Sequence, residues 1–462
     1  MKRAHLTLMA AACTLLAGCG SLVPPTEKIA PPLRQDFRPG MTPINLPTDT
    51  ANEWDGFFAD ARLRKVVGIA LLENRGLRAS AAVVERVRAQ HRITEADRIP
   101  DLNAGASATR QQVAGGATTS SYAVNLGLAS YEIDLFNRLA SLEGAALSRY
   151  LAQQQTQRSA QLSLVAEVSN AWLTLAAEQQ RLTLAQQLRD SQQRTLSLTE
   201  QRHQLGAASG LERARARTAF EAARGEATRA AAAITQARLA LELLAGQPLP
   251  DDLLPTTQGM EALTALPALP GGLPAEVLLQ RPDLRAAEQA LQAAAFDVGA
   301  ARAARFPRLT LTASGGTRSP ELDGLFKSST GFWSVVPQLD LPLFDGGARA
   351  AQVEVSQANR RQALATYEGA LQSAFREAAD ALAVRDSLAE RLDAQQAQVA
   401  AAAQSLRFSE DSYRLGGSSQ LELLDAQRQL ATAQQALITL RLAEQANRVT
   451  LLRALGGRWA AS

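Results

Sequence analysis

The stretch Tyr413-Arg-Leu-Gly416-Gly417-Ser-Ser-Gln-Leu-Glu-Leu-Leu-Asp425 interrupts a long run of good helix formers near the C-terminus. Two adjacent glycines followed by two serines are typical of a helix C-cap followed directly by the N-cap of the next helix. The stretch therefore predicts the tight tip of a long hairpin of two antiparallel helices.

A second stretch of the same kind occurs earlier, at His203-Gln-Leu205-Gly206-Ala-Ala-Ser-Gly210-Leu211-Glu212. Its Leu-Gly pair precedes Leu415-Gly416 by 210 residues (416 − 206). The return helices end at Gly246 and Gly456, each 40 residues after its tip glycine (246 − 206 and 456 − 416). The chain is therefore an internal duplication, with one hairpin tip predicted at 205–211 and the other at 415–421.

The composition favours long helices and excludes several classes of protein. Only 5% of the 462 residues are aromatic, and 48 basic residues nearly balance 45 acidic ones. An Ala-, Gln- and Leu-rich chain with helical periodicity is typical of coiled coils, and the balanced charge argues against nucleic-acid binding. The three histidines lie far apart with no second His or Cys at ligand spacing, and no nucleophile elbow or phosphate loop occurs. We therefore expect no enzyme activity, no metal and no cofactor.

The first 18 residues are predicted to be a signal peptide. A basic start precedes an apolar run over 6–17, which is too short to span a bilayer. The run ends in Leu16-Ala17-Gly18-Cys19, which resembles the lipobox of bacterial lipoproteins and implies acylation of Cys19. Gly20 in place of Asp points, by the same resemblance, to the outer membrane. The alternative is an ordinary signal peptide that contains a cysteine.

The rest of the chain is expected to form a lipidated arm, two repeats and a linker. The arm is rich in Pro and polar residues, which favours an extended chain leading away from the lipid. A flexible tether is the alternative for 20–40, and 54–58 is expected to dock on the body. The predicted divisions are 19–60 (arm), 61–246 (first repeat), 247–275 (Pro-rich linker), 276–457 (second repeat) and 458–462 (tail).

Each repeat opens with a helix that stops at a proline. A helix predicted over 60–98 stops before Pro100, and its duplicate over 283–305 stops before Pro307. Period-2 alternation of apolar with small or polar residues follows each proline, which predicts two strands within about 101–134 and two within about 308–343. Such segments are the signature of membrane β-strands, with soluble hairpins as the alternative. A lipid-facing sheet cannot keep open edges in a bilayer, so four strands would be part of a barrel that other subunits close.

Three motifs carry a family resemblance. The segments Arg281 to Leu291, Gly299 to Pro307 and Asp340 to Gly347 look like those of the TolC-like outer-membrane efflux proteins. With the lipobox, the chain is most similar to the OprM/NodT-type lipoprotein branch. The resemblance covers nearly the whole mature chain.

The resemblance implies a fold class that is mainly α with a membrane β-barrel part. Three chains would form a homotrimer, with four strands per chain in a shared 12-stranded β-barrel and paired hairpins in a periplasmic α-barrel. The location would be the cell outer membrane, with a lipid anchor, an inserted barrel and a periplasmic extension.

The implied function is a passive export duct for small molecules or drugs in a tripartite pump. An inner-membrane transporter of the resistance-nodulation-division (RND) type would supply the energy through a periplasmic adaptor, also called a membrane fusion protein. The alternatives are an outlet for type I protein secretion and a lipid-anchored periplasmic coiled-coil scaffold.

The resemblance places a periplasmic constriction at the hairpin tips, where Leu421 and Asp425 share a helix face. It implies that Leu421 forms a hydrophobic ring and that Asp425 and Glu422 form acidic ones, and that Tyr413 and Glu212 help to hold the tips closed. The repeat sets Arg215 opposite Asp425, so a contact between them is a hypothesis. Ser418 and Ser419 stand where some relatives have a basic residue.

The implied adaptor contacts are the tips at 203–215 and 413–425, with Gly206, Gly210, Gly416 and Gly417 at the turns. For all these charged residues, the alternative is a solvated helix surface.

Overall fold

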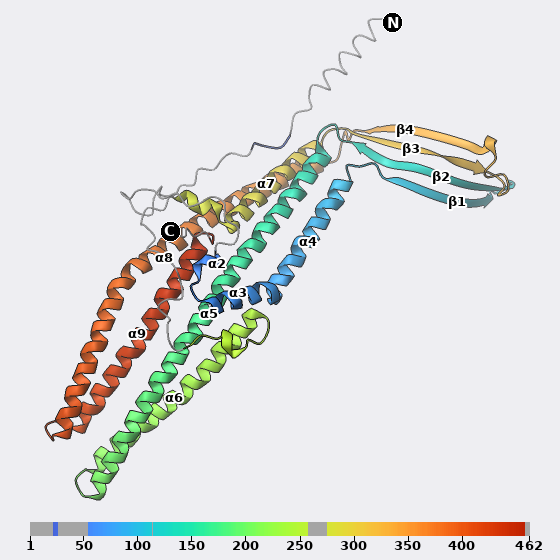
Figure 1. Cartoon of the computed structure of the whole chain (residues 1–462). Coiled ribbons are helices and arrows are strands. Elements are labelled where there is room, and N and C mark those ends of the chain that lie inside the picture. Colours follow the sequence, from blue (N-terminus) through green and yellow to red (C-terminus); the bar gives the residue numbers. More distant parts are fainter. Residues whose placement is uncertain (1–21, 26–53, 113, 257–274, 458–462) are drawn as a thin grey trace. The chain divides into compact units, whose positions relative to one another are not determined.

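The computed structural model describes residues 22–25, 54–112, 114–256 and 275–457 (Figure 1). The signal segment, Cys19, the arm over 26–53, the linker over 257–274 and the tail over 458–462 lie outside the described residues. The chain forms two compact units, and each unit takes segments from both repeats. Unit 1 contains Val83–Gln155 and Arg285–Gly369, and unit 2 contains Thr156–Leu284 and Ala370–Ser462.

Unit 1 contains one antiparallel sheet of four strands in the order β1-β2-β3-β4 (Figure 1). The strands are β1 (Leu102–Gln112), β2 (Thr118–Ile133), β3 (Arg308–Ser319) and β4 (Gly331–Asp340). Because β2 pairs with β3, the two repeats meet in the middle of the sheet. β1 and β4 are the two edge strands.

The strand register separates the sheet into an apolar and a polar face. Leu102 pairs with Leu128 on β1–β2, and Leu309 pairs with Leu339 on β3–β4. Residues directly opposite one another share a face, so these leucines continue across the sheet. The apolar face is made by Leu102, Ala104, Ala106, Tyr122, Val124, Leu126, Leu128, Leu309, Leu311, Ala313, Trp333, Val335 and Leu339.

A β-bulge keeps that division intact along β2. The register shifts between Leu128 and Tyr131, and Ser130 has φ 51°. The extra residue returns Tyr131 and Ile133 to the apolar face, where they pair with Leu311 and Leu309. The apolar residues of β2 therefore stay on one face of the sheet on both sides of the bulge.

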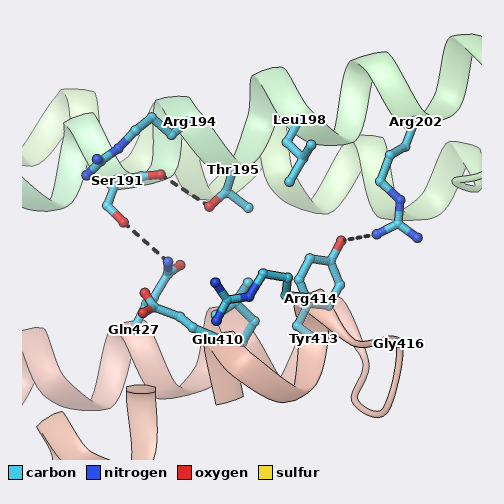
Figure 2. Close-up of a pocket in the computed structure, with 11 residues that line it drawn as sticks. Ser191, Arg194, Thr195, Leu198, Arg202, Glu410, Tyr413, Arg414, Gly416 and Gln427 are labelled. Atoms are coloured by element: carbon cyan, nitrogen blue, oxygen red, sulfur yellow. Dashed lines mark hydrogen bonds between the residues drawn. The ribbon is translucent and has the colours of Figure 1, made fainter. Parts of the chain in front are cut away.

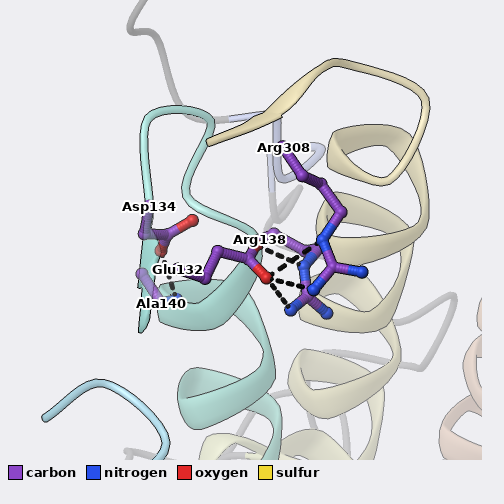
Figure 3. Close-up of polar contacts among 5 residues, drawn as sticks. All are labelled: Glu132, Asp134, Arg138, Ala140 and Arg308. Carbon is purple, nitrogen blue, oxygen red and sulfur yellow. Dashed lines mark hydrogen bonds and ion pairs between the residues drawn. The ribbon is translucent and has the colours of Figure 1, made fainter. Parts of the chain in front are cut away.

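Polar side chains join the sheet to the first long helix, α5 (Arg138–Gln204) (Figure 3). The carboxylate of Glu132, at the end of β2, accepts hydrogen bonds from Arg138 at 2.8 and 2.7 Å. It also accepts from Arg308, the first residue of β3, at 3.1 and 2.6 Å. Asp134 accepts from the backbone N–H of Ala140 at 2.8 Å and so caps the helix.

Four long helices form two hairpins, α5 with α6 (Gly210–Ala245) and α8 (Ala348–Arg414) with α9 (Gln420–Ala454). Both outgoing helices have 67 residues, and the return helices have 36 and 35. At 1.5 Å per residue the longer helices extend about 100 Å. The matched lengths confirm the duplicated, mainly helical fold class predicted from the sequence. Among the described helices, none is both long and apolar enough to cross a membrane.

The core of unit 2 is centred on Trp172 of α5, which is 1% exposed. Phe57 and Phe58, at the end of α2 (Trp54–Phe57), are buried in the same cluster. The Trp172 indole N–H donates to the carbonyl of Leu253 at 3.2 Å, in the short turn η1 (Asp251–Leu253). The described start of the linker thus packs against the middle of α5.

One predicted helix is two helices. The segment expected to be continuous over 60–98 is divided into α3 (Ala61–Glu73) and α4 (Arg75–Ala96). Asn74 between them is extended, with φ −60° and ψ 123°. Its side-chain oxygen accepts from the N–H of Leu77, and its amide donates to the carbonyl of Leu244, both at 2.9 Å. The prediction was wrong because this break depends on the end of α6, 170 residues away.

The remaining helix, α7 (Pro282–Ala303), is the duplicate of α4 and leads into β3. It packs closely on α5 in unit 1. A Cβ added to Gly144 of α5 would lie 2.8 Å from the ring of Phe296 of α7, so only glycine leaves room for that ring.

Candidate functional site

The two hairpin tips have the same local architecture. Gly206 and Gly416 have φ of 74° and 79°, a left-handed conformation that favours glycine and ends the outgoing helices. At the first tip the Ser209 hydroxyl accepts from the N–H of Glu212 at 3.1 Å, and Glu212 accepts from the N–H of Ser209 at 2.6 Å. Ser419 and Glu422 make the same two bonds at 3.3 and 3.0 Å.

These bonds give Glu212 and Glu422 a local role as capping-box residues. The backbone N–H of Ser209, followed by its hydroxyl, lowers the pKa of Glu212 below its ordinary value. The sequence carries the signal for this role, a serine followed three residues later by glutamate. From the sequence, a serine cap was predicted only at the second tip, and neither glutamate was assigned to a cap.

Tyr413 contacts Arg202, a residue that the sequence interpretation did not select (Figure 2). The Tyr413 hydroxyl accepts from Arg202 at 2.9 Å, and the guanidinium lies 5.5 Å from the centre of the tyrosine ring. The contact joins α5 of the first hairpin to α8 of the second. The repeat gave no signal for it, because the duplicate of Arg202 is Ser412 (202 + 210).

The Arg202–Tyr413 contact borders a cavity of about 760 Å³ near the tips. Arg194 and Leu198 line it from α5, and Glu410 and Arg414 line it from α8 (Figure 2). Three arginines against one glutamate make this lining basic.

Asp425 and Leu421 line a different cavity of about 800 Å³, between α5, α6 and α9. The Asp425 carboxylate is paired with Arg428 and accepts from the Gln429 amide at 2.6 Å. Leu421 is 52% exposed. The shared lining agrees with the sequence argument that Leu421 and Asp425 occupy one helix face.

The two contacts considered from the sequence are not made within this chain, as far as the structure describes it. Arg215 lines the cavity of Asp425, but Asp425 is paired with Arg428 on its own helix. Tyr413 is bonded to Arg202, and Glu212 to Ser209. In both cases, a partner that the sequence argument did not consider satisfies the polar group.

Polar pairs also join the two hairpins above the tips. The amide of Gln192 on α5 donates to Gln427 on α9 at 2.8 Å, and Gln420 donates to Thr199 at 2.9 Å. All four side chains are at most 5% exposed. Gln192 and Thr199 are seven residues apart on α5 (199 − 192), and Gln420 and Gln427 are seven residues apart on α9 (427 − 420). The two bonds therefore follow the register of an antiparallel coiled coil. Among the described residues, no group of three or more His, Cys, Asp or Glu could hold a metal ion.

These features define a class of protein. A sheet with one apolar face and unpaired edge strands suits a shared membrane barrel. Duplicated hairpins with outgoing helices about 100 Å long suit a helical wall. The fold is that of an outer-membrane channel subunit.

The chain belongs to the outer membrane efflux protein family. The family model matches twice, at residues 66–247 and 273–457, once for each repeat. Probable efflux pump outer membrane protein TtgC of Pseudomonas putida is 38% identical over 98% of this chain and 96% of its own length. Outer membrane protein OprJ of Pseudomonas aeruginosa is 39% identical over 99% and 97%.

Solved structures agree with the family assignment. The open state of the Neisseria gonorrhoeae MtrE outer membrane channel matches with a TM-score of 0.84 and 36% identity, over 95% of this chain and 98% of that one. The protein is thus an outer-membrane channel of an efflux system. The family consists of efflux channels, which are not enzymes.

Proposed function

We propose that three copies of this chain form one channel that serves as the passive outer duct of a tripartite efflux pump. Each copy gives its four strands to a shared 12-stranded barrel and its two hairpins to a periplasmic helical barrel. An inner-membrane transporter of the RND type drives small molecules through the channel, and a periplasmic adaptor connects the two.

The observation that carries this proposal is the sheet, whose apolar face ends at two open edges. Trp333, Val335 and Leu339 of edge strand β4 are 81%, 55% and 64% exposed. In lipid, unpaired edge N–H and C=O groups are costly, so a sheet with a lipid-facing side must be closed. Neighbouring chains supply the closure.

The native mass of the detergent-extracted protein, corrected for bound detergent, tests the assembly. A Cys19→Ser variant separates the lipid anchor from the barrel. We expect three chains per particle and continued need for detergent in the variant, because the barrel remains. A water-soluble monomer or dimer of the variant would rule out a shared barrel.

The lipid anchor at Cys19 is part of the proposal, and the adjacent described residues support it. The carbonyl of Leu22 accepts from Arg302 of α7 at 3.1 Å, and that of Pro25 accepts from Arg360 of α8 at 3.2 Å. Residues 22–25 are thereby held on unit 1, which contains the sheet. Leu22 is three residues after Cys19 in the sequence, so the chain is held on unit 1 shortly after the proposed lipid site.

We place the adaptor at the tips and the constriction at Leu421, Asp425 and Tyr413. Leu205 and Leu415, which precede the tip glycines, are 84% and 85% exposed. A Cβ added at Gly206 or Gly416 would meet nothing within 4 Å, so the backbone there is open to a partner. Exposed leucines at two equivalent tips suit a partner that docks in equivalent copies.

A further inference from the structure

The start of the second strand pair and the start of the first long helix meet at an aromatic contact inside the chain. Phe136, just before α5, stacks on Phe306, just before β3, with ring centroids 4.6 Å apart and an interplanar angle of 16°. The contact joins a residue of the first repeat to a residue of the second.

Among the residues that the structure describes, the duplicates of these two residues have no such contact. Phe136 corresponds to Phe344 (136 + 208), and Phe306 corresponds to Ile99 (306 − 207). Phe344 is 94% exposed and Ile99 is 65% exposed. A large apolar side chain with this exposure at the base of a membrane sheet indicates a missing partner.

The helices that flank this contact are complementary under the same correspondence. Inside the chain, Gly144 of α5 leaves space for Phe296 of α7. Their duplicates are Gln352 of α8 (144 + 208) and Ala89 of α4 (296 − 207). In the first pair the small residue is on the long helix, and in the duplicate pair the large residue is on the long helix. The combined volume of one large and one small side chain is thereby retained.

The edge strands are also compatible under this correspondence. Tyr131 of β2 pairs with Leu311 of β3, and Ile133 pairs with Leu309. The duplicates set Leu339 (131 + 208) opposite Ala104 (311 − 207), and Leu341 (133 + 208) opposite Leu102 (309 − 207). All four duplicates are apolar, as the lipid-facing side of a continued sheet requires.

We propose that Phe344 packs against Ile99 of a second copy of this chain, and that this contact repeats between chains the Phe136–Phe306 contact within the chain. In the same interface β4 pairs with β1 of the second copy, with Leu339 opposite Ala104, and Gln352 packs over Ala89. The proposal rests on the proposed assembly and adds its register. One chain would carry both halves of the interface, which permits a closed ring of identical contacts.

Cysteine cross-linking in the full-length lipoprotein tests the register. A double variant, Phe344→Cys with Ile99→Cys, is treated in membranes with a short bifunctional thiol reagent and run on a denaturing gel. We expect bands of two and three chains. The chain's own Cys19 is expected to be acylated and not to react.

Two matched pairs serve as controls. Phe136→Cys with Phe306→Cys tests the contact within the chain, so it should give a cross-linked peptide pair by mass spectrometry and no band of two or three chains. Phe344→Cys with Leu322→Cys pairs a position after β4 with one in the loop before it, and the ten-residue strand between them is about 33 Å long. Leu322 is 66% exposed, so its failure to cross-link would reflect distance.

The outcomes separate the register from the assembly. Loss of the Phe344–Ile99 cross-link, or equal cross-linking of the Phe344–Leu322 pair, in a particle that still contains three chains would overturn the register and leave the assembly standing. A particle of one chain would overturn both. As a second measurement, Phe344→Ala should dissociate the trimer at a lower temperature in detergent, while Phe326→Ala, at a 77% exposed loop position, should not.

Discussion

At the scale of single residues, the charge at the proposed constriction is set by neighbours one turn away. Asp425 is paired with Arg428, so in the proposed trimer three guanidinium groups would accompany the three Asp425 carboxylates. Both side chains are exposed, at 42% and 74%, and such surface pairs contribute little to stability. Their effect is on the local potential that a permeating ion meets.

Asp425→Ala should therefore change ion selectivity as well as conductance. Without the carboxylate Arg428 is unpaired, so we expect a higher single-channel conductance and a shift of permeability from cations toward anions in planar bilayers. Glu410→Ala, in the other cavity, is the control and should leave selectivity unchanged. If Asp425→Ala has the selectivity and conductance of the unmodified protein, Asp425 does not line the constriction.

Tyr413→Phe should loosen the contact between the two tips. The ring over the guanidinium remains, but the hydrogen bond to Arg202 is lost, which costs about 1 kcal/mol, or roughly fivefold in an opening equilibrium. We expect more frequent open events in bilayer recordings. Arg194→Ala changes a residue of the same cavity that does not contact Tyr413 in Figure 2, and it should leave the opening frequency unchanged. Equal effects of both variants would argue against a specific role for the hydroxyl.

At the scale of elements, Arg281 joins the start of α7, the middle of α8 and the end of α9 in unit 2. It is 6% exposed, and its guanidinium bonds Asp283 at 2.7 Å and Glu377 at 2.8 Å. It also donates to the carbonyl of Ala454, at the end of α9, at 3.2 Å. Burial alone would raise the pKa of Asp283, but the hydrogen bonds from Arg281 outweigh burial and hold that pKa below its ordinary value.

Arg281→Ala should lower the free energy of unfolding by about 2 to 3 kcal/mol, because it leaves a half-buried carboxylate unpaired. The helical circular-dichroism signal during thermal unfolding measures this change. Arg376→Ala removes an exposed pair with Asp380, whose side chains are 83% and 69% exposed, and should cost under about 1 kcal/mol. Equal losses for the two variants would contradict the assigned role of Arg281.

The same cluster predicts a pH dependence. The pKa of Asp283 is lower in the folded than in the unfolded chain, so the stabilisation is complete above the unfolded value near 3.9 and is lost as pH falls through the folded value. Melting temperatures between pH 7 and pH 3 should therefore fall less steeply for Asp283→Asn than for the unmodified protein. Parallel curves would mean that other carboxylates dominate the acid response.

At the scale of the whole molecule, the sheet determines where the protein resides. Neighbouring residues of β4 belong to opposite faces, with Val335 paired to Ala313 on the apolar face and Val336 paired to Thr312 on the polar face. The same substitution at Val335 and at Val336 therefore separates the effect of lipid contact from the effect of strand propensity.

Val335→Lys should impair membrane insertion, since a lysine on the lipid side of a barrel costs about 2 to 4 kcal/mol near the bilayer midplane. Val336→Lys places the same residue toward the polar side and should be tolerated. The amount of trimer recovered from outer membranes with detergent measures both. Comparable recovery of the two variants would show that this face does not contact lipid.

Local patterns in the sequence were sufficient for the duplication, the two tips and the two strand pairs. Glycine in a left-handed turn, proline at the end of a helix and period-2 alternation act over a few residues, so they can be read without tertiary structure. The family resemblance added the outer-membrane location, and it is the source of the proposed trimer. The capping boxes at Glu212 and Glu422 were also readable, from the Ser-x-x-Glu spacing at each tip.

Only the tertiary structure decided the partners of side chains that meet across helices. Asn74 breaks a continuous helical pattern because its amide reaches Leu244, and Tyr413 bonds Arg202 on the other hairpin. Such contacts depend on which helix faces lie together at one level, and a pattern that repeats within each helix does not determine this. The sequence thus determined the elements, their duplication and the local partners of the tip carboxylates, while the packing of one hairpin against the other decided that Tyr413 bonds Arg202.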